Sequence, residues 1–159
     1  DYYASRGLGD VYKRQVNIKA EQFNKFLNDN NLAKIFQTEE IQGEMHPIVY
    51  RSFMDVDGQN LPTMLVIDDS IYVMLQVRVA NGVVKESNKV AVLSHINKLN
   101  EMYKIFKYYV TDSGDIIIES CIPSSDKEFL PEMIYTAINI ILSHLKEEYP
   151  KIMKAVWAE

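Results

Sequence analysis

The side chains of this sequence that could carry out catalysis or bind a metal are few. The histidines fall in three different predicted elements, and their spacing to one another and to the single cysteine is not that of metal ligands. We interpret each histidine as a surface or interface residue and the cysteine as a strand residue, and we expect no metal and no cofactor. These candidates are His46, His95, His144 and Cys121.

Three pairs of adjacent acids could act as a general acid and base if burial separated their pKa values. Asp68–Asp69 falls in a predicted turn, Glu39–Glu40 near a weak strand, and Glu147–Glu148 in a late helix. These positions are typical of solvated surfaces. The chain also lacks a nucleophile elbow, a phosphate-binding loop and a dinucleotide fingerprint. The sequence therefore predicts a protein that is not an enzyme.

Composition limits the remaining classes. With 159 residues, 47% hydrophobic and 11% aromatic, the chain can form one domain with a substantial core. A formal charge of −5 disfavours nucleic-acid binding, which needs clustered Lys and Arg. No apolar run approaches the roughly 20 residues of a membrane helix. One cysteine favours a reducing compartment, so we expect a cytoplasmic protein that contacts neither nucleic acid nor membrane.

The first residues differ from the rest. The string RGLGDVYKRQ, residues 6–15, resembles the translated sequencing-adapter readthrough that can precede an open reading frame. We predict that residues 1–15 are a non-native leader, which is excluded from fold reasoning. The domain itself is expected to span residues 16–159.

The sequence of the first half of that domain predicts a helix followed by an antiparallel meander. Apolar residues at helical spacing predict a helix over residues 19–29. Strands are expected at residues 34–41, weakly, and at 48–56, 62–67 and 71–79. The turns between them are Asp55–Val56–Asp57–Gly58, read as a hairpin because no calcium-loop Glu follows, and Asp68–Asp69–Ser70.

Residues 87–123 organise the second half. Ser87 is a candidate N-cap for a helix whose apolar residues recur with a period near 3.6. Asn97 and Asn100 lie on the face that also holds Leu93 and Ile96. Either these amides bond to a neighbouring strand end and fix its register, or they form a polar patch that meets a partner or second subunit. The candidate structural or interface residues are Leu93, Ile96, Asn97, Asn100 and Tyr103.

A hairpin and a last helix complete the chain. Strands are expected at residues 105–110 and 116–122 around a turn at Gly114, with the second strand covered on both faces near its start. The tyrosines at 103, 108 and 109 are either a stacking platform or a sheet face under a helix, and the acidic charge favours the latter. Pro131 begins an apolar helix that Pro150 is expected to end.

The segment VLSHINKLNEMYKIFKYYVTDSGDIIIESCIP resembles the YbjN-like family, in which a helix with an L-N-x-L-N-like core runs into a strand and a D-x-x-G-type turn. The first leucine of that pattern is isoleucine here. The residues that carry the resemblance are Ile96, Asn97, Leu99, Asn100, Phe106, Asp112 and Gly114.

The resemblance implies the type III secretion chaperone-like fold: α+β, with helices packed on an antiparallel, strongly bent sheet, in the order α-β-β-β-(β)-α-β-β-α. It also implies a homodimer that binds a protein partner without catalysis. The main alternative is a small-molecule-binding or enzymatic domain with a pocket between sheet and helices, where His46, His95 or Asp68–Asp69 converge. A third is a regulator that senses a small molecule.

Overall fold

The structure is a computed structural model that describes residues 17–158. The predicted leader, residues 1–15, lies outside this range. Within it, three helices and six strands follow the order α-β-β-β-β-α-β-β-α. This confirms the predicted α+β class and its element order.

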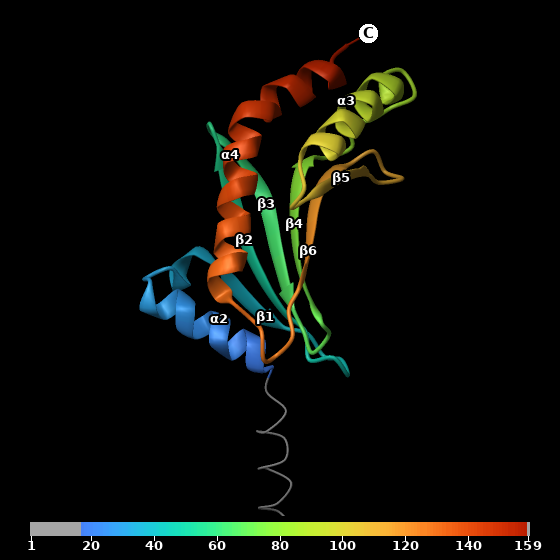
Figure 1. The fold of residues 1–159 in the computed structure, drawn as a ribbon. Coiled ribbons are helices and arrows are strands. Elements are labelled where there is room, and N and C mark those ends of the chain that lie inside the picture. The colour runs from blue at the N-terminus through green and yellow to red at the C-terminus, as the bar shows by residue number, and fades with distance from the viewer. Residues whose placement is uncertain (1–16, 159) are drawn as a thin grey trace, which may run out of the picture.

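The six strands form one antiparallel sheet in the order β1-β2-β3-β4-β6-β5 (Figure 1). The first four strands are a meander, and β6 inserts between β4 and β5 because it pairs with both. The strands are β1 (Gln37–Glu40), β2 (Ile48–Val56), β3 (Gln59–Ile67), β4 (Tyr72–Ala80), β5 (Lys107–Val110) and β6 (Ile116–Pro123).

The three helices are α2 (Ile18–Asp29), α3 (Lys89–Met102) and α4 (Pro131–Val156), with a 3-10 turn, η1 (Ala33–Ile35), before β1. In Figure 1, α4 runs along the sheet, α2 lies near its first turns, and α3 lies beside its last turns. Asn17 begins α2, since its side chain accepts a hydrogen bond from the Ala20 amide.

The helices and one face of the sheet enclose a single core. Strand residues alternate with a period of two, so one set from each strand points the same way. Leu65 of β3 and Leu75 of β4 are paired neighbours on this face, and both are fully buried. They join a hydrophobic cluster to which α2, α3 and α4 all contribute. All three helices therefore cover the same face.

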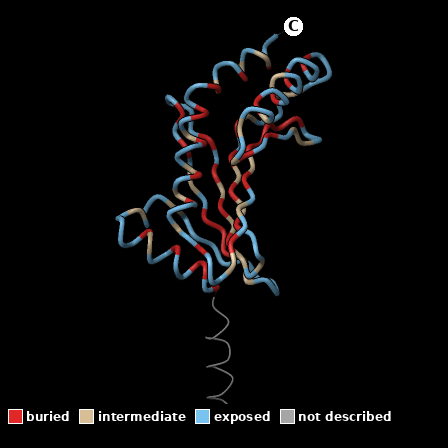
Figure 2. The backbone as a smooth tube through the Cα atoms, in the orientation of Figure 1, coloured by how far each residue is buried: buried red, intermediate tan, exposed pale blue. Residues whose placement is uncertain are grey.

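The opposite face carries the alternate residues and has more exposed side chains. Phe53 is 69% exposed, Tyr72 45% and Tyr109 40%. Ile117 also points this way yet is buried, which agrees with the prediction that β6 begins covered on both sides. Figure 2 shows the buried backbone concentrated along the strands and the helix sides that face them. We call the less covered side the open face.

Several predicted boundaries differ from the structure. The weak strand predicted at residues 34–41 is present as β1, which begins at Gln37 because Ala33–Ile35 form η1; the strands predicted at 62–67 and 105–110 begin at Gln59 and Lys107. The N-cap of α3 is Asn88 and not Ser87. The Asn88 side chain makes no capping bond to the helix; its Oδ1 accepts from the Lys85 amide, and its Nδ2 donates to the carbonyls of Val83 and Val156. The helix α4 passes through Pro150 to Val156. An exposed proline removes one backbone donor, and the packing of Ile152 and Val156 beyond it outweighs that loss.

No helix in residues 17–158 is both long enough and apolar enough to span a membrane.

Candidate functional site

The five predicted interface residues divide between the inside and the outside of the molecule. Ile96 is buried in the core, and Asn100 and Tyr103 are half-buried. Leu93 is 40% exposed, and Asn97 is also exposed. The two asparagines, three residues apart on α3, therefore have different environments.

Asn100 joins α3 to the edge strand β5. Its Oδ1 accepts a hydrogen bond from the Tyr108 amide at 2.7 Å, and its Nδ2 donates to the Tyr108 carbonyl at 3.1 Å. A single side chain thus satisfies both backbone groups of one residue, as a neighbouring strand would. This supports the register-fixing alternative for Asn100. It also blocks the β5 edge at Tyr108 against pairing with another strand.

The end of α3 is held by the same strand. The Lys107 ammonium donates to the carbonyls of Asn100 and Tyr103, at 2.6 and 2.7 Å. The last carbonyls of a helix lack hydrogen-bond partners within the helix. A cation at this end is also stabilised by the negative end of the helix dipole. The helix-to-strand connection is therefore fixed from both sides.

Behind β5 lies a buried aromatic cluster around His144, so the interpretation of this histidine as a surface or interface residue was wrong. The His144 ring of α4 lies 4.2 Å from the Tyr103 ring centroid and 4.6 Å from that of Phe106. Its Nε2 is 2.6 Å from the Tyr108 hydroxyl. The hydroxyl donates if His144 is neutral with its proton on Nδ1, and that Nδ1 is buried without a partner.

Burial sets the protonation of this pair. It lowers the pKa of His144 to about 4, although the nearby Glu148 carboxylate acts in the opposite direction. Burial, with the charge of Glu148 as a second cause, raises the pKa of Tyr108 above its ordinary value. Both groups are therefore neutral near pH 7. Glu148, which was expected on a solvated surface together with Glu147, is in fact buried and accepts a hydrogen bond from Lys151 at 3.0 Å.

The tyrosines do not form a stacking platform. Tyr108 points into the core, whereas Tyr109 points to the open face and donates to Glu119 at 3.0 Å. Tyr103 stacks on Phe106 at the end of α3. Successive strand residues face opposite sides, which separates the two β5 tyrosines.

Of the residues that could converge in an enzyme, one pair does so. His46 Nδ1 lies 2.5 Å from Asp69 Oδ2, between the loop before β2 and the turn after β3. Both side chains are about 40% exposed. His95 lies elsewhere, with Nε2 3.8 Å from Glu148. Among residues 17–158, no group of three His, Cys, Asp or Glu side chains could hold a metal ion.

Lys19 is buried, although a charged side chain is usually found at the surface. Its side chain is fully buried and donates to three backbone carbonyls, those of Ser70, Tyr72 and Ser124. Burial lowers its pKa, and Asp68 is the main charge acting in the opposite direction. All three ammonium donors are used, so Lys19 ties α2 to the β3–β4 turn and to the end of β6.

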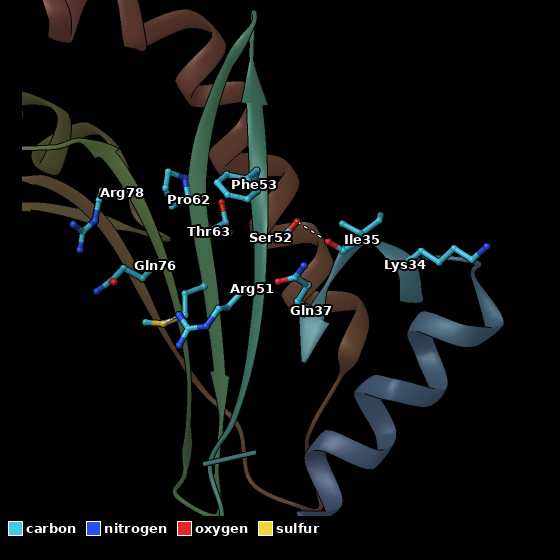
Figure 3. Close-up of a pocket in the computed structure, with 11 residues that line it drawn as sticks. Lys34, Ile35, Gln37, Arg51, Ser52, Phe53, Pro62, Thr63, Gln76 and Arg78 are labelled. Carbon is cyan, nitrogen blue, oxygen red and sulfur yellow. Dashed lines mark hydrogen bonds between the residues drawn. The ribbon is translucent and has the colours of Figure 1, made fainter. Parts of the chain in front are cut away.

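A pocket of about 530 Å³ lies on the open face, across β2, β3 and β4 (Figure 3). It forms where the β3–β4 pairing stops. The ladder runs from Ile67↔Val73 to Thr63↔Val77, and the next β3 residue is Pro62, which has no amide to donate. The lining residues are Lys34, Ile35, Gln37, Arg51, Ser52, Phe53, Pro62, Thr63, Met64, Gln76 and Arg78.

No family model matches the chain, and no curated protein matches it. The YbjN-like resemblance therefore stays a prediction.

Proposed function

We propose that this chain is a non-enzymatic protein-binding module, chaperone-like or regulatory, that acts as a cytoplasmic homodimer. The observation that carries the proposal is the asymmetric covering of the sheet. Three helices pack on one face, and the other face keeps exposed aromatic side chains such as Phe53 and Tyr109. Exposed apolar surface of this kind marks interaction sites.

The finer expectations belong to the same proposal. A YbjN-like chain would have a strongly bent sheet of the type III secretion chaperone-like fold. Such a fold would bind a protein client through grooves or edges and would need no cofactor.

The outer side of α3 is our proposed self-association surface. Val90 is 82% exposed and Leu93 40%, and with the exposed Asn97 they follow one side of the helix. Asn100 and Ile96 do not belong to this surface, because both are engaged inside the molecule. Two copies could pair their α3 helices about a two-fold axis, which is the commonest symmetry of dimers.

Light scattering on the purified chain tests the homodimer. We expect twice the chain mass, and Leu93→Glu should return the protein to a monomer because it places a charge in an apolar contact. Met133→Glu, an exposed position on α4, is the matched control and should leave the mass unchanged. A wild-type monomer that captures no partner from a native lysate would count against the whole proposal.

One observation favours the alternative, a small-molecule-binding or enzymatic domain. The His46–Asp69 contact has the geometry of a base and its orienting carboxylate. Neither residue lines the pocket on the open face. If His46→Ala abolished binding of a small molecule without unfolding the protein, this alternative would replace the protein-binding proposal.

A further inference from the structure

We propose that the pocket on the open face binds an extended peptide of a partner protein that combines acidic and apolar side chains. This inference rests on the proposed protein-binding function and names the site and the chemistry of the partner. The pocket lies where β2 and β3 leave their neighbours, so side chains and strand edges are accessible together (Figure 3).

The charge of the pocket is opposite to that of the chain. The molecule carries −5, yet the ionisable residues that line the pocket are Lys34, Arg51 and Arg78. The acids around the pocket already have partners: Glu39 lies 3.5 Å from Arg51, and Asp115 lies 3.2 Å from Arg78. Glu119 accepts hydrogen bonds from Gln76 and Tyr109, and Asp55, farther along β2, accepts one from the Gly58 amide. Both arginine side chains are still about half exposed. Each guanidinium has five N–H donors, so both can donate further hydrogen bonds to the carboxylates of a ligand.

The rest of the lining is suited to apolar side chains. Phe53 is 69% exposed, Ile35 50%, and Pro62 and Met64 complete the apolar part of the pocket. The Arg51 guanidinium lies against the Met64 sulfur at 3.6 Å, which places a charge at the border of this apolar area. A ligand that carries apolar and acidic side chains on one side of its backbone would therefore meet both kinds of surface.

An extended backbone is favoured by the edge of β2. The pairing of β1 with β2 ends at Gln37↔Arg51, and the chain before it turns away at η1, where the Ser52 hydroxyl donates to the Ile35 carbonyl. In a hairpin with a two-residue turn, the backbone groups of alternate residues point away from the partner strand. At Phe53 and Asp55 the backbone amide and carbonyl groups point away from β3, toward the edge of β2 beyond the last residue that β1 pairs with. They can pair with an added strand.

Charge also decides against a second copy as the occupant. Two copies that met symmetrically through this face would place the Arg51 and Arg78 of each against those of the other. Like charges brought together across an interface oppose association. A small anion alone would leave Phe53 and its apolar neighbours uncovered.

The test measures fluorescence anisotropy with labelled peptides in which serine fills every second position, so that the remaining side chains share one face of an extended strand. Those remaining positions alternate leucine with glutamate, leucine with lysine, or serine with glutamate. We expect the leucine–glutamate peptide to bind and the other two to bind more weakly. The double variant Arg51→Glu/Arg78→Glu should weaken binding by about tenfold or more, because it repels the carboxylates. Phe53→Ser should weaken it as well.

The matched control is Lys98→Glu/Lys104→Glu, which makes the same charge change at two exposed positions away from the open face. It should leave peptide affinity unchanged. Equal weakening by both double variants, or equal binding of the leucine–lysine peptide, would overturn the proposal. So would full displacement by inorganic pyrophosphate, which would indicate a small-anion site, or a loss of dimer mass on Phe53→Ser.

This experiment separates the two levels of inference. If the wild-type chain dimerises in light scattering but binds none of the three peptides, the peptide site is wrong and the protein-binding function stands. If the wild type neither dimerises nor binds any protein, the function itself is wrong.

Discussion

The side-chain amide of Asn100 forms hydrogen bonds to both the amide and the carbonyl of Tyr108. One residue of α3 therefore takes the place of a strand at the edge of β5. Asn97, one helical turn earlier, makes no such contact in the described part of the chain and is exposed. The two asparagines form a matched pair for measuring what this bridge contributes.

Asn100→Ala should lower the free energy of unfolding by about 2–3 kcal/mol, because two partly buried backbone groups lose their partner. Asn97→Ala should change it by less than about 0.5 kcal/mol, as is usual at exposed positions. Urea unfolding followed by circular dichroism measures both. If the two variants were equally stable, Asn100 would not hold β5 in place.

Lys19→Met should lower the free energy of unfolding by about 2–4 kcal/mol, since three carbonyls lose a charged donor and methionine cannot replace it. The control is Lys25→Met on the same helix, whose side chain is exposed and pairs with Asp29. An exposed pair of this spacing contributes about 0.5 kcal/mol at most. Equal losses from both substitutions would show that the buried position of Lys19 contributes nothing.

The buried His144 should make stability fall with acid. Its pKa is about 4 in the folded chain, below the ordinary value of 6.5, so the unfolded chain binds the proton more readily. Stability from this group is complete above pH 6.5 and is lost as the pH falls toward 4. The loss should reach about 2 kcal/mol by pH 5.

Urea unfolding at pH 7.5 and pH 5 measures this loss. His144→Phe should reduce the loss of unfolding free energy between pH 7.5 and pH 5, because phenylalanine fills the buried site and takes up no proton. The ionisable groups that face His144 are Tyr103, Tyr108 and Glu148, and the last of these partly offsets the shift. A wild-type protein whose stability did not differ between the two pH values would contradict the burial of His144.

Gly114 should tolerate alanine less well than Gly58. Both have positive φ, +83° and +91°, so a side chain costs about 1–2 kcal/mol at either position. At Gly114 an added Cβ would also lie 2.5 Å from the Val84 carbonyl oxygen, whereas at Gly58 it meets nothing within 4 Å. We expect Gly114→Ala to be more destabilising in thermal unfolding, and similar melting temperatures would contradict the close approach.

Much of the architecture follows from local pattern. The alternation in residues 71–79 predicts a strand with one apolar side, and Val73, Leu75 and Val77 are indeed fully buried. Turn residues such as Gly114, which has positive φ, mark the hairpins because few other residues adopt that conformation. The element order and the antiparallel sheet were therefore predictable from residues that are close in sequence.

The features that the sequence did not predict depend on contacts between residues that are far apart in the chain. Asn97 and Asn100 are the same residue type, three positions apart on α3. Only the position of β5 gives them different roles, because Tyr108 of β5 bonds to Asn100. Pro150 signals a helix end, but the packing of Ile152 and Val156 carries α4 past it. Tertiary packing contributes more free energy than local helix or turn preferences. The packed structure therefore forms even where the local preference of a residue opposes it.

The sequence alone thus determined the elements and which side of each is apolar, because side-chain periodicity is a property of neighbouring residues. Only the tertiary structure decided that all three helices cover one face of the sheet, that Lys19 is buried among carbonyls, and that His144 meets Tyr108. The open face and its basic pocket exist because all three helices pack on the other face of the sheet and leave this one uncovered.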